Sequence, residues 1–152
     1  MTNKKILVTG GAGFIGSCYI KLMLETHTDY EVINLNALTY AGNLETLKEA
    51  ETNPNYRFVN GDIRENDLIY KLFAEGLDYV VKFAAESHVD RSIEVPEIFV
   101  DTNINGTQCL LEAVRKHWGE GCLDRRYLQV STDEVYCDLG PEGFFTETIK
   151  DL

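Results

Sequence analysis

The sequence predicts an α/β fold built on a doubly wound parallel sheet, with residues 1–152 forming one domain. Two observations lead to this prediction. Short apolar segments rich in β-branched residues alternate with helical patterns along the chain, and Gly, Asp or Asn marks each change. A glycine-rich segment, 10–16, also stands directly between the first strand pattern and the first helix pattern.

The strand patterns begin with Ile6-Leu7-Val8 and end just before residue 132. The fourth is almost wholly apolar, as expected of a strand buried on both faces. A strand returns parallel to its predecessor only through a crossover, and such crossovers are right-handed. We therefore expect parallel strands at 6–8, 31–35, 56–59, 79–84 and 127–131.

Helical patterns separate these strands. The second is polar and short, and Asn53-Pro54-Asn55 breaks it, whereas the last is long and is entered through Pro96. The expected helices are 14–25, 44–51, 66–75 and about 97–118. Their apolar spacing predicts as core residues Leu110, Leu111 and Val114, together with Phe83 of the fourth strand.

The composition excludes several classes of partner. The chain is 44% hydrophobic and 26% charged, which is ordinary for a soluble globular protein. Its net charge of -11 argues against nucleic acid and anionic membranes, because these partners need clustered Lys and Arg. A phosphate-bearing small molecule stays compatible, since a helix N-terminus holds an anion without basic side chains.

Signals for targeting, membrane insertion or metal binding do not stand out. The partly apolar run 6–20 contains four glycines and lacks an Ala-x-Ala cleavage site, so it predicts a strand and a turn, not a secretory signal. No apolar stretch reaches the roughly eighteen residues of a membrane span. We expect a cytoplasmic protein without a metal site, whose scattered cysteines are free thiols: Cys18, Cys109, Cys122 and Cys137.

The glycine-rich segment matches the dinucleotide-binding pattern. G-x-G-x-x-G begins at Gly11, and G-x-x-G-x-x-G links Gly10, Gly13 and Gly16. Such glycines permit a tight turn, close approach of the backbone to a pyrophosphate, and close packing of helix and strand. Because a strand precedes the pattern and a helix follows it, we favour a Rossmann-like dinucleotide site over a flexible loop in an unrelated protein.

Asn36 ends the second strand, where a dinucleotide fold often carries an acid that bonds the adenosine ribose. Asn still bonds a hydroxyl, but it lacks the charge that disfavours a 2′-phosphate. No Arg follows immediately to hold such a phosphate. NAD is therefore the expected cofactor, with a weaker preference over NADP than Asp would give.

Two adjacent carboxylates, Asp133 and Glu134, follow Thr132 beyond the fifth strand, at the edge where open α/β sheets bind ligands. They are suited to acid and base roles in an elimination if their environments separate their pKa values. Both reach one substrate only if the strand ends and the backbone turns, since neighbours on a strand point to opposite faces. The residues leave an alternative equally open, in which Asp133 caps a turn and Glu134 is solvated.

Four segments together resemble a known family. They are Thr9-Gly-Gly-Ala-Gly-Phe-Ile-Gly16, Ala37-Leu-Thr-Tyr-Ala-Gly-Asn43, Phe83-Ala-Ala-Glu-Ser-His-Val-Asp-Arg-Ser92 and Ser131-Thr-Asp-Glu-Val-Tyr136. They are similar to the signature segments of the dTDP-glucose 4,6-dehydratases, in the extended short-chain dehydrogenase/reductase family. The similarity runs collinearly from Lys5 to about Glu147, and the Thr-Asp-Glu triplet is its most specific part.

The resemblance implies a lyase that converts dTDP-glucose through an internal redox cycle. NAD takes a hydride from C4 of the sugar, water leaves across C5 and C6, and the hydride returns to C6. Asp133 would protonate the leaving 6-hydroxyl, Glu134 would remove the C5 proton and Thr132 would bond near O4, with His88 close to the substrate. The resemblance and the glycine pattern assign to the cofactor Gly10, Gly13, Phe14, Ile15, Gly16, Asn36, Ala37, Leu38, Thr39, Asp62, Ile63, Ala84, Ala85, Glu86, Ser87 and Thr102.

Some of these residues have simpler interpretations. Asp62 follows a strand and is also suited to start a turn, and Thr102 is also compatible with an ordinary helix position. Arg91 either binds a phosphate or pairs with Asp90 on the surface, and we favour the surface pair.

The sequence departs from the family in three respects. The family relies on a Tyr-x-x-x-Lys pair, and no tyrosine here has a Lys four residues later. Cys137 replaces a usual Gly, and Lys82 replaces a frequent His or Asn. The family pattern would place the Tyr-x-x-x-Lys pair, a sixth strand and the smaller substrate domain beyond Leu152, so we expect the 152 residues alone to turn over very slowly or not at all.

Three interpretations stay open. The chain is part of a dehydratase, a short non-catalytic protein that binds a dinucleotide, or a related nucleotide-sugar epimerase or reductase, which the Thr-Asp-Glu triplet disfavours. The long last helix and the family resemblance suggest a homodimer.

Overall fold

Five parallel strands form one sheet in the order β3-β2-β1-β4-β5. The structure, a computed structural model, describes residues 4–136, 143, 144 and 146. The strands are β1 (Lys4–Thr9), β2 (Tyr30–Asn36), β3 (Tyr56–Asn60), β4 (Tyr79–Lys82) and β5 (Arg126–Gln129). This confirms the predicted doubly wound α/β fold. The chain moves outward from β1 in one direction to β3 and then crosses back to β4, so the winding reverses between β1 and β4.

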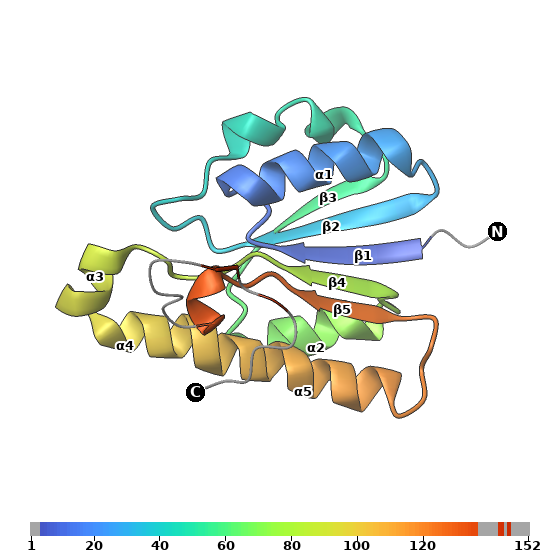
Figure 1. Ribbon diagram of the computed structural model, residues 1–152. Helices are drawn as coiled ribbons and strands as arrows, with labels where there is room; N and C mark the ends of the chain where they lie inside the picture. The colour runs from blue at the N-terminus through green and yellow to red at the C-terminus, as the bar shows by residue number, and fades with distance from the viewer. Residues whose placement is uncertain (1–3, 137–142, 145, 147–152) are drawn as a thin grey trace.

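Helical segments cover both faces of the sheet (Figure 1). Alternate residues of β1 separate into two cores, with Ile6 and Val8 on one face and Leu7 on the other. One face packs against α1 (Phe14–Thr26) and the 3-10 turns η1 (Leu44–Leu47) and η2 (Ala50–Thr52). The other packs against α2 (Asn66–Ala74) and α5 (Gly106–Trp118).

Three predicted elements differ in extent. The polar segment 44–51 forms two 3-10 turns, not one α-helix, as expected of a sequence with little apolar surface to hold a longer helix against the sheet. The fourth strand ends at Lys82, two residues early, because Phe83 and Ala84 both donate their N–H groups to the carbonyl of Thr9. The fifth strand ends at Gln129, before Ser131.

The long last helix is present but is not uniform. It runs through α4 (Pro96–Phe99), the π-helical segment η3 (Val100–Asn105) and α5. The N–H of Gly106 bonds the carbonyl of Asp101, five residues earlier, which defines the wider π turn. A further short helix, α3 (Val89–Glu94), precedes it and was not predicted.

The predicted core residues, three on α5 and Phe83 after β4, are confirmed with one exception. Leu110 is fully buried between α5 and the sheet, and Val114 and Phe83 pack at the margins of the two cores. Leu111 is 46% exposed, so its assignment to the core was wrong. Adjacent helical residues are separated by about 100° around the axis, so the sheet covers one and not the other.

The described residues bear on the expectations about cysteines, metals and membranes. Cys18, Cys109 and Cys122 are free thiols there, and Cys137 lies outside the described residues. Over the same residues, His, Cys, Asp and Glu nowhere gather in a group able to hold a metal ion. Nor is any described helix both long and apolar enough to cross a membrane.

The Leu110–Leu111 pair provides a test of this packing. Leu110→Ala removes a fully buried side chain and should lower the free energy of unfolding by about 2–5 kcal/mol. Leu111→Ala, one residue further on a partly exposed face, should change it by about 0.5 kcal/mol or less. Urea denaturation followed by circular dichroism measures both, and equal losses for the two variants would contradict the orientation of α5.

Candidate functional site

The turn after β1 brings three strand ends together. Gly10 has φ of +72°, a backbone conformation that side chains disfavour. A Cβ atom there would lie 2.6 Å from the backbone N of Ala84, in the loop after β4. The N–H of Gly10 also donates to the carbonyl of Leu35 in β2, at 2.9 Å. The turn therefore fits between its neighbours only because residue 10 has no side chain.

The same turn aims the N-terminus of α1 at the carboxyl edge of the sheet (Figure 1). A Cβ on Gly16 would lie 2.4 Å from the carbonyl oxygen of Gly10, so the first turn of the helix packs tightly on the loop. Gly13 is the N-cap residue, without a capping side chain, and the first turn contains no acidic residue. Phe14 and Ile15 are exposed beside it. The first-turn N–H groups are thus available to an anion.

Gly13 differs from Gly10 and Gly16 because the space that a Cβ atom would occupy is open. A Cβ atom there would meet only the carbonyl oxygen of Gly10, at 3.2 Å. Its φ of -78° is also accessible to any residue. Neither packing nor backbone conformation demands glycine as strongly here as at Gly10, which is consistent with space kept for a ligand.

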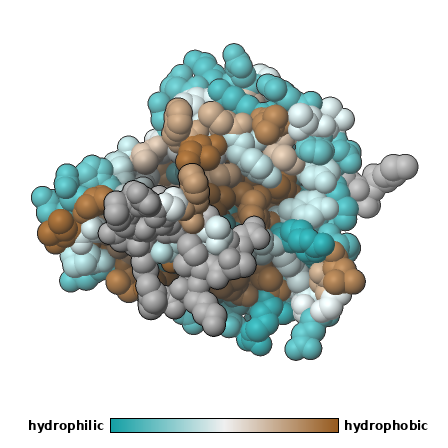
Figure 2. Space-filling view, viewed as in Figure 1, coloured by the Kyte–Doolittle hydropathy of each residue, from teal (hydrophilic) through white to brown (hydrophobic). Residues whose placement is uncertain are grey.

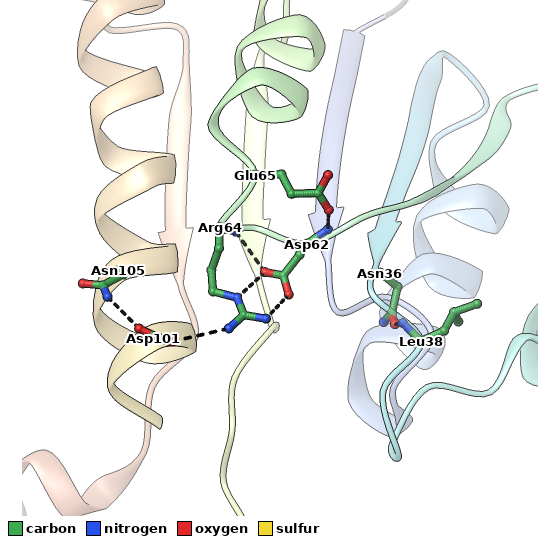
Figure 3. Close-up of polar contacts among 7 residues, drawn as sticks. All are labelled: Asn36, Leu38, Asp62, Arg64, Glu65, Asp101 and Asn105. Atoms are coloured by element: carbon green, nitrogen blue, oxygen red, sulfur yellow. Dashed lines mark hydrogen bonds and ion pairs between the residues drawn. The ribbon is translucent and has the colours of Figure 1, made fainter. Parts of the chain in front are cut away.

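The loop after β2 is fixed by Asn36. The Asn36 side chain is buried, and its Oδ1 accepts the N–H of Leu38 at 2.7 Å (Figure 3). Leu38 takes φ of +50°, and the N–H of Asn43 then donates to the carbonyl of Ala12 at 2.9 Å. This turn carries Ala37 and Thr39 along the same edge. The Asn36 Nδ2 makes no hydrogen bond to a described residue, so it is able to donate to a ligand.

The loop after β3 holds Asp62 in an ion pair. The Asp62 carboxylate accepts bonds from the Arg64 side chain, at 3.0 Å from Nε and 2.7 Å from Nη2, and from the Arg64 N–H at 2.9 Å (Figure 3). Burial favours a higher pKa for Asp62, but the hydrogen bonds from Arg64 outweigh it, so the pKa is lowered. The turn-starting role of Asp62 is confirmed. Ile63, next to it, is buried.

The loop after β4 contains a buried carboxylate, Glu86, which is 7% exposed. Arg91 of α3 lies 3.4 Å from the Glu86 carboxylate, measured from Nη1 to Oε2, and its guanidinium stacks over the Tyr40 ring at 4.4 Å from the centroid. The favoured pair of Arg91 with Asp90 was therefore wrong, because a buried carboxylate and an aromatic face both lie within reach. Arg91 links the loops that follow β2 and β4.

The remaining predicted residues lie along the same edge. Ala84, Ala85 and Ser87 belong to the loop with Glu86, His88 is the exposed N-cap residue of α3, and Thr102 is half-buried in η3. Beyond β5 the backbone turns into η4 (Asp133–Tyr136), directly after Thr132. This satisfies the condition for Asp133 and Glu134 to leave the strand geometry. Their side chains lie outside what the structure describes.

Three residues that organise this edge were not predicted: Tyr40, Arg64 and Asn103. Tyr40 and Asn103 contact residues distant in the sequence, for which periodicity carries no signal. Arg64 bonds its near neighbour Asp62, and the Asp62-x-Arg64 spacing was the one available signal. Arg64 bonds Asp62 and also lies 3.8 Å from the Asp101 carboxylate of η3, and Asn103 bonds Glu86 (Figure 3 shows the Arg64 pairs).

A groove of about 310 Å³ lies away from this edge, beside α1 and over the face of the sheet formed by β1, β4 and β5. It is lined by Ile6, Tyr19, Met23, His27, Tyr30, Tyr79, Val80, Val81, Arg126 and Leu128. Most of these side chains are apolar or aromatic, and the polar ones stand near the amino ends of the strands. Because ligands of open α/β sheets bind at the carboxyl ends, this groove is not the predicted site.

These features define a class of protein: an α/β domain with a glycine turn and an uncapped helix at the switch point between β1 and β4, an arrangement typical of dinucleotide-binding domains. A family model described as GDP-mannose 4,6 dehydratase matches residues 7–150. The chain belongs to this nucleotide-sugar 4,6-dehydratase family, which confirms the resemblance seen in the sequence.

Individual relatives agree with this assignment. The dTDP-glucose 4,6-dehydratase of Xanthomonas campestris pv. campestris (strain B100) is 52% identical over 147 residues, covering 93% of this chain and 41% of the relative. The crystal structure of the Bacillus anthracis enzyme in complex with NAD has a TM-score of 0.84 at 43% identity, covering 98% of this chain and 44% of that one. The Streptomyces venezuelae enzyme, with NAD and TYD bound, has a TM-score of 0.86 at 43% identity over 97% and 45%. The chain thus spans about two fifths of the length of these relatives.

Lys82 lies at the end of β4, close to this edge. It is only 2% exposed, and no carboxylate of a described residue pairs with its ammonium. Burial lowers the pKa of Lys82 from its ordinary value of 10.5.

This burial predicts a pH-dependent stability. Unfolding exposes Lys82 and restores its ordinary pKa, so between the lowered pKa and 10.5 the unfolded chain binds more protons than the folded one. Stability relative to Lys82→Met should therefore rise with pH through that window, by at most about 1.4 kcal/mol per pH unit. Urea denaturation of both proteins from neutral pH to pH 10 measures it.

Lys71→Met, at an exposed position of α2, is the control and should leave the pH dependence as in the wild type. Parallel pH profiles for the wild type and Lys82→Met would contradict the burial of an unpaired lysine.

Proposed function

We propose that residues 1–152 form the NAD-binding domain of a dTDP-glucose 4,6-dehydratase. The observation that carries this proposal is the glycine turn, with its open space at Gly13 beside the uncapped N-terminus of α1. A pyrophosphate needs this combination of close backbone approach and unpaired N–H groups. Two similar structures contain bound NAD and several close relatives are dTDP-glucose 4,6-dehydratases, and both findings support the proposal.

The residues present fit a dinucleotide. Gly10, Gly13 and Gly16 shape the turn, and the backbone of Phe14 and Ile15 would hold the pyrophosphate at the start of α1. The free Nδ2 of Asn36 would bond a ribose hydroxyl. The segment 37–39 carries no basic side chain, and Arg64 is engaged by Asp62 and Asp101, so the site offers little to a 2′-phosphate. These features favour NAD over NADP.

The dehydration would be divided between adjacent side chains. NAD, when bound, supplies the oxidation at C4 and the later reduction at C6. Glu134 would remove the C5 proton, Asp133 would donate a proton to the leaving 6-hydroxyl, and Thr132 would orient the sugar through O4. The backbone turn after β5 supports this division, because it frees neighbouring residues from the opposite faces of a strand.

Homodimer formation and a cytoplasmic location remain part of the proposal. Apolar side chains are exposed along α3 and η3, among them Val89, Ile93, Val100 and Ile104. Figure 2 shows apolar residues at the surface where α3 lies. Such a row of apolar side chains is suited to a contact with a second subunit.

Cofactor binding is tested by Gly13→Ala. The added methyl group meets one backbone atom in the folded chain and should cost about 1 kcal/mol of stability or less. It would stand in the space reserved for the pyrophosphate, so NAD affinity should fall by about tenfold or more. Titration calorimetry on the 152-residue chain measures NAD and NADP binding, with NAD expected to bind more tightly.

Cys18→Ala, at an exposed position of the same helix, is the control and should bind NAD normally. Normal NAD binding by Gly13→Ala would refute the assignment of the turn, and an absence of binding by the wild type would refute the cofactor.

The proposed roles of Glu134 as base and Asp133 as acid are tested in the protein made from the native reading frame. Glu134→Gln should abolish exchange of the substrate C5 hydrogen with deuterated water, whereas Asp133→Asn should keep that exchange and lose elimination. Each substitution should lower the dehydration rate by about 10² to 10⁴. Mass spectrometry of the sugar measures both steps, and Glu120→Gln, an exposed carboxylate after α5, is the control. Exchange that survives in Glu134→Gln would reassign the base.

A further inference from the structure

The Asn103 side chain bonds both backbone groups of Glu86, in the loop after β4. Its Oδ1 accepts the N–H of Glu86 at 2.9 Å, and its Nδ2 donates to the carbonyl of Glu86 at 2.8 Å. The two residues are 17 positions apart in the chain, and the contact is partly buried. One primary amide therefore bonds both backbone hydrogen-bonding groups of Glu86, in the loop that contains Ala84 to Ser87.

The π turn explains why this side chain faces the sheet edge. Asn103 lies inside η3, where the N–H of Gly106 bonds five residues back to Asp101. Asn103 is half-buried, whereas Asp101, Ile104 and Asn105 around it are exposed. The Asn103 carbonyl also accepts the Thr107 hydroxyl at 2.6 Å. A π turn is an energetically uncommon element that is often found where a helix serves a functional site.

The same π segment also contacts the loop after β3. Arg64 Nη1 lies 3.8 Å from the Asp101 carboxylate. Directly after the segment, a Cβ on Gly106 would lie 2.5 Å from Cδ1 of Ile63, so the helix approaches this loop closely. Residues 100–106 thus contact two of the loops that carry predicted cofactor residues. The contact to the loop after β4 runs through Asn103.

We propose that Asn103 is a positioning residue for the dinucleotide site, and this inference rests on the proposed function. It touches neither cofactor nor substrate by this assignment. By bonding the N–H and the carbonyl of Glu86, it keeps the backbone of 84–87 in place before the ligand arrives. Without it, the loop has to be ordered on binding, and the ordering lowers the affinity for NAD.

Three variants of the 152-residue chain separate this role from a general loss of stability. Asn103→Ala removes both hydrogen bonds to Glu86. Asn103→Asp keeps the acceptor for the Glu86 N–H and loses the donor to its carbonyl. Asn105→Ala is the matched control, because Asn105 lies in the same π segment and bonds only the exposed Asp101 side chain, at 2.9 Å.

Two readouts are taken: amide hydrogen exchange by NMR and NAD affinity by calorimetry. In Asn103→Ala the Glu86 amide should exchange at least about tenfold faster and NAD should bind about tenfold more weakly. In Asn103→Asp the Glu86 amide should stay protected. Asn105→Ala should match the wild type in both readouts.

Unchanged exchange of the Glu86 amide in Asn103→Ala would overturn the inference. So would faster exchange with unchanged NAD affinity, which would leave Asn103 a structural residue only. If the wild-type chain binds no NAD, the proposed function fails and the positioning role fails with it.

Discussion

The structure depends on the absence of a side chain at Gly10. At this point the chain leaves β1 under a positive φ, and its backbone passes within reach of Ala84 after β4 while it bonds Leu35 in β2. Any Cβ would collide with backbone atoms, which have no alternative rotamer to adopt. Three strand ends therefore meet around one glycine, and α1 starts where they meet.

This meeting point gives the sheet edge its chemistry. The chain winds away from β1 on both sides, so the loops after β2 and β4 leave in opposite directions at the switch point, where ligands of open α/β sheets bind. Side-chain contacts then fix these loops: Asn36 bonds Leu38, Arg91 joins Glu86 to Tyr40, and Asn103 bonds the N–H and the carbonyl of Glu86. Arg91 and Asn103 thus hold the site from its periphery, whereas Asn36 both fixes its loop and would bond the ribose in the proposed function.

Local patterns predicted most of this architecture. The number and sequence of the strands, the parallel sheet and the turn at 10–16 follow from periodicity and from residues adjacent in sequence, and the structure confirms them. The ends of the fourth and fifth strands differ from the prediction. Leu111, the Arg91 contacts and the π segment did not follow, because each depends on tertiary structure: the sheet under α5, the burial of Glu86 and the approach of Tyr40, or the loops beside η3. For the candidate site, sequence could locate Asp62 but not the Arg64 guanidinium that occupies its carboxylate.

The most direct test of this account is an NMR titration of the 152-residue chain with NAD, mapped onto the backbone amides. If NAD binds at the glycine turn, the largest shifts should fall in Gly11 to Ile15, with further shifts in the loops after β2, β3 and β4. Residues of the groove beside α1, such as Tyr30 and Arg126, should shift little. Shifts confined to that groove, or none at all, would contradict a dinucleotide site at the glycine turn.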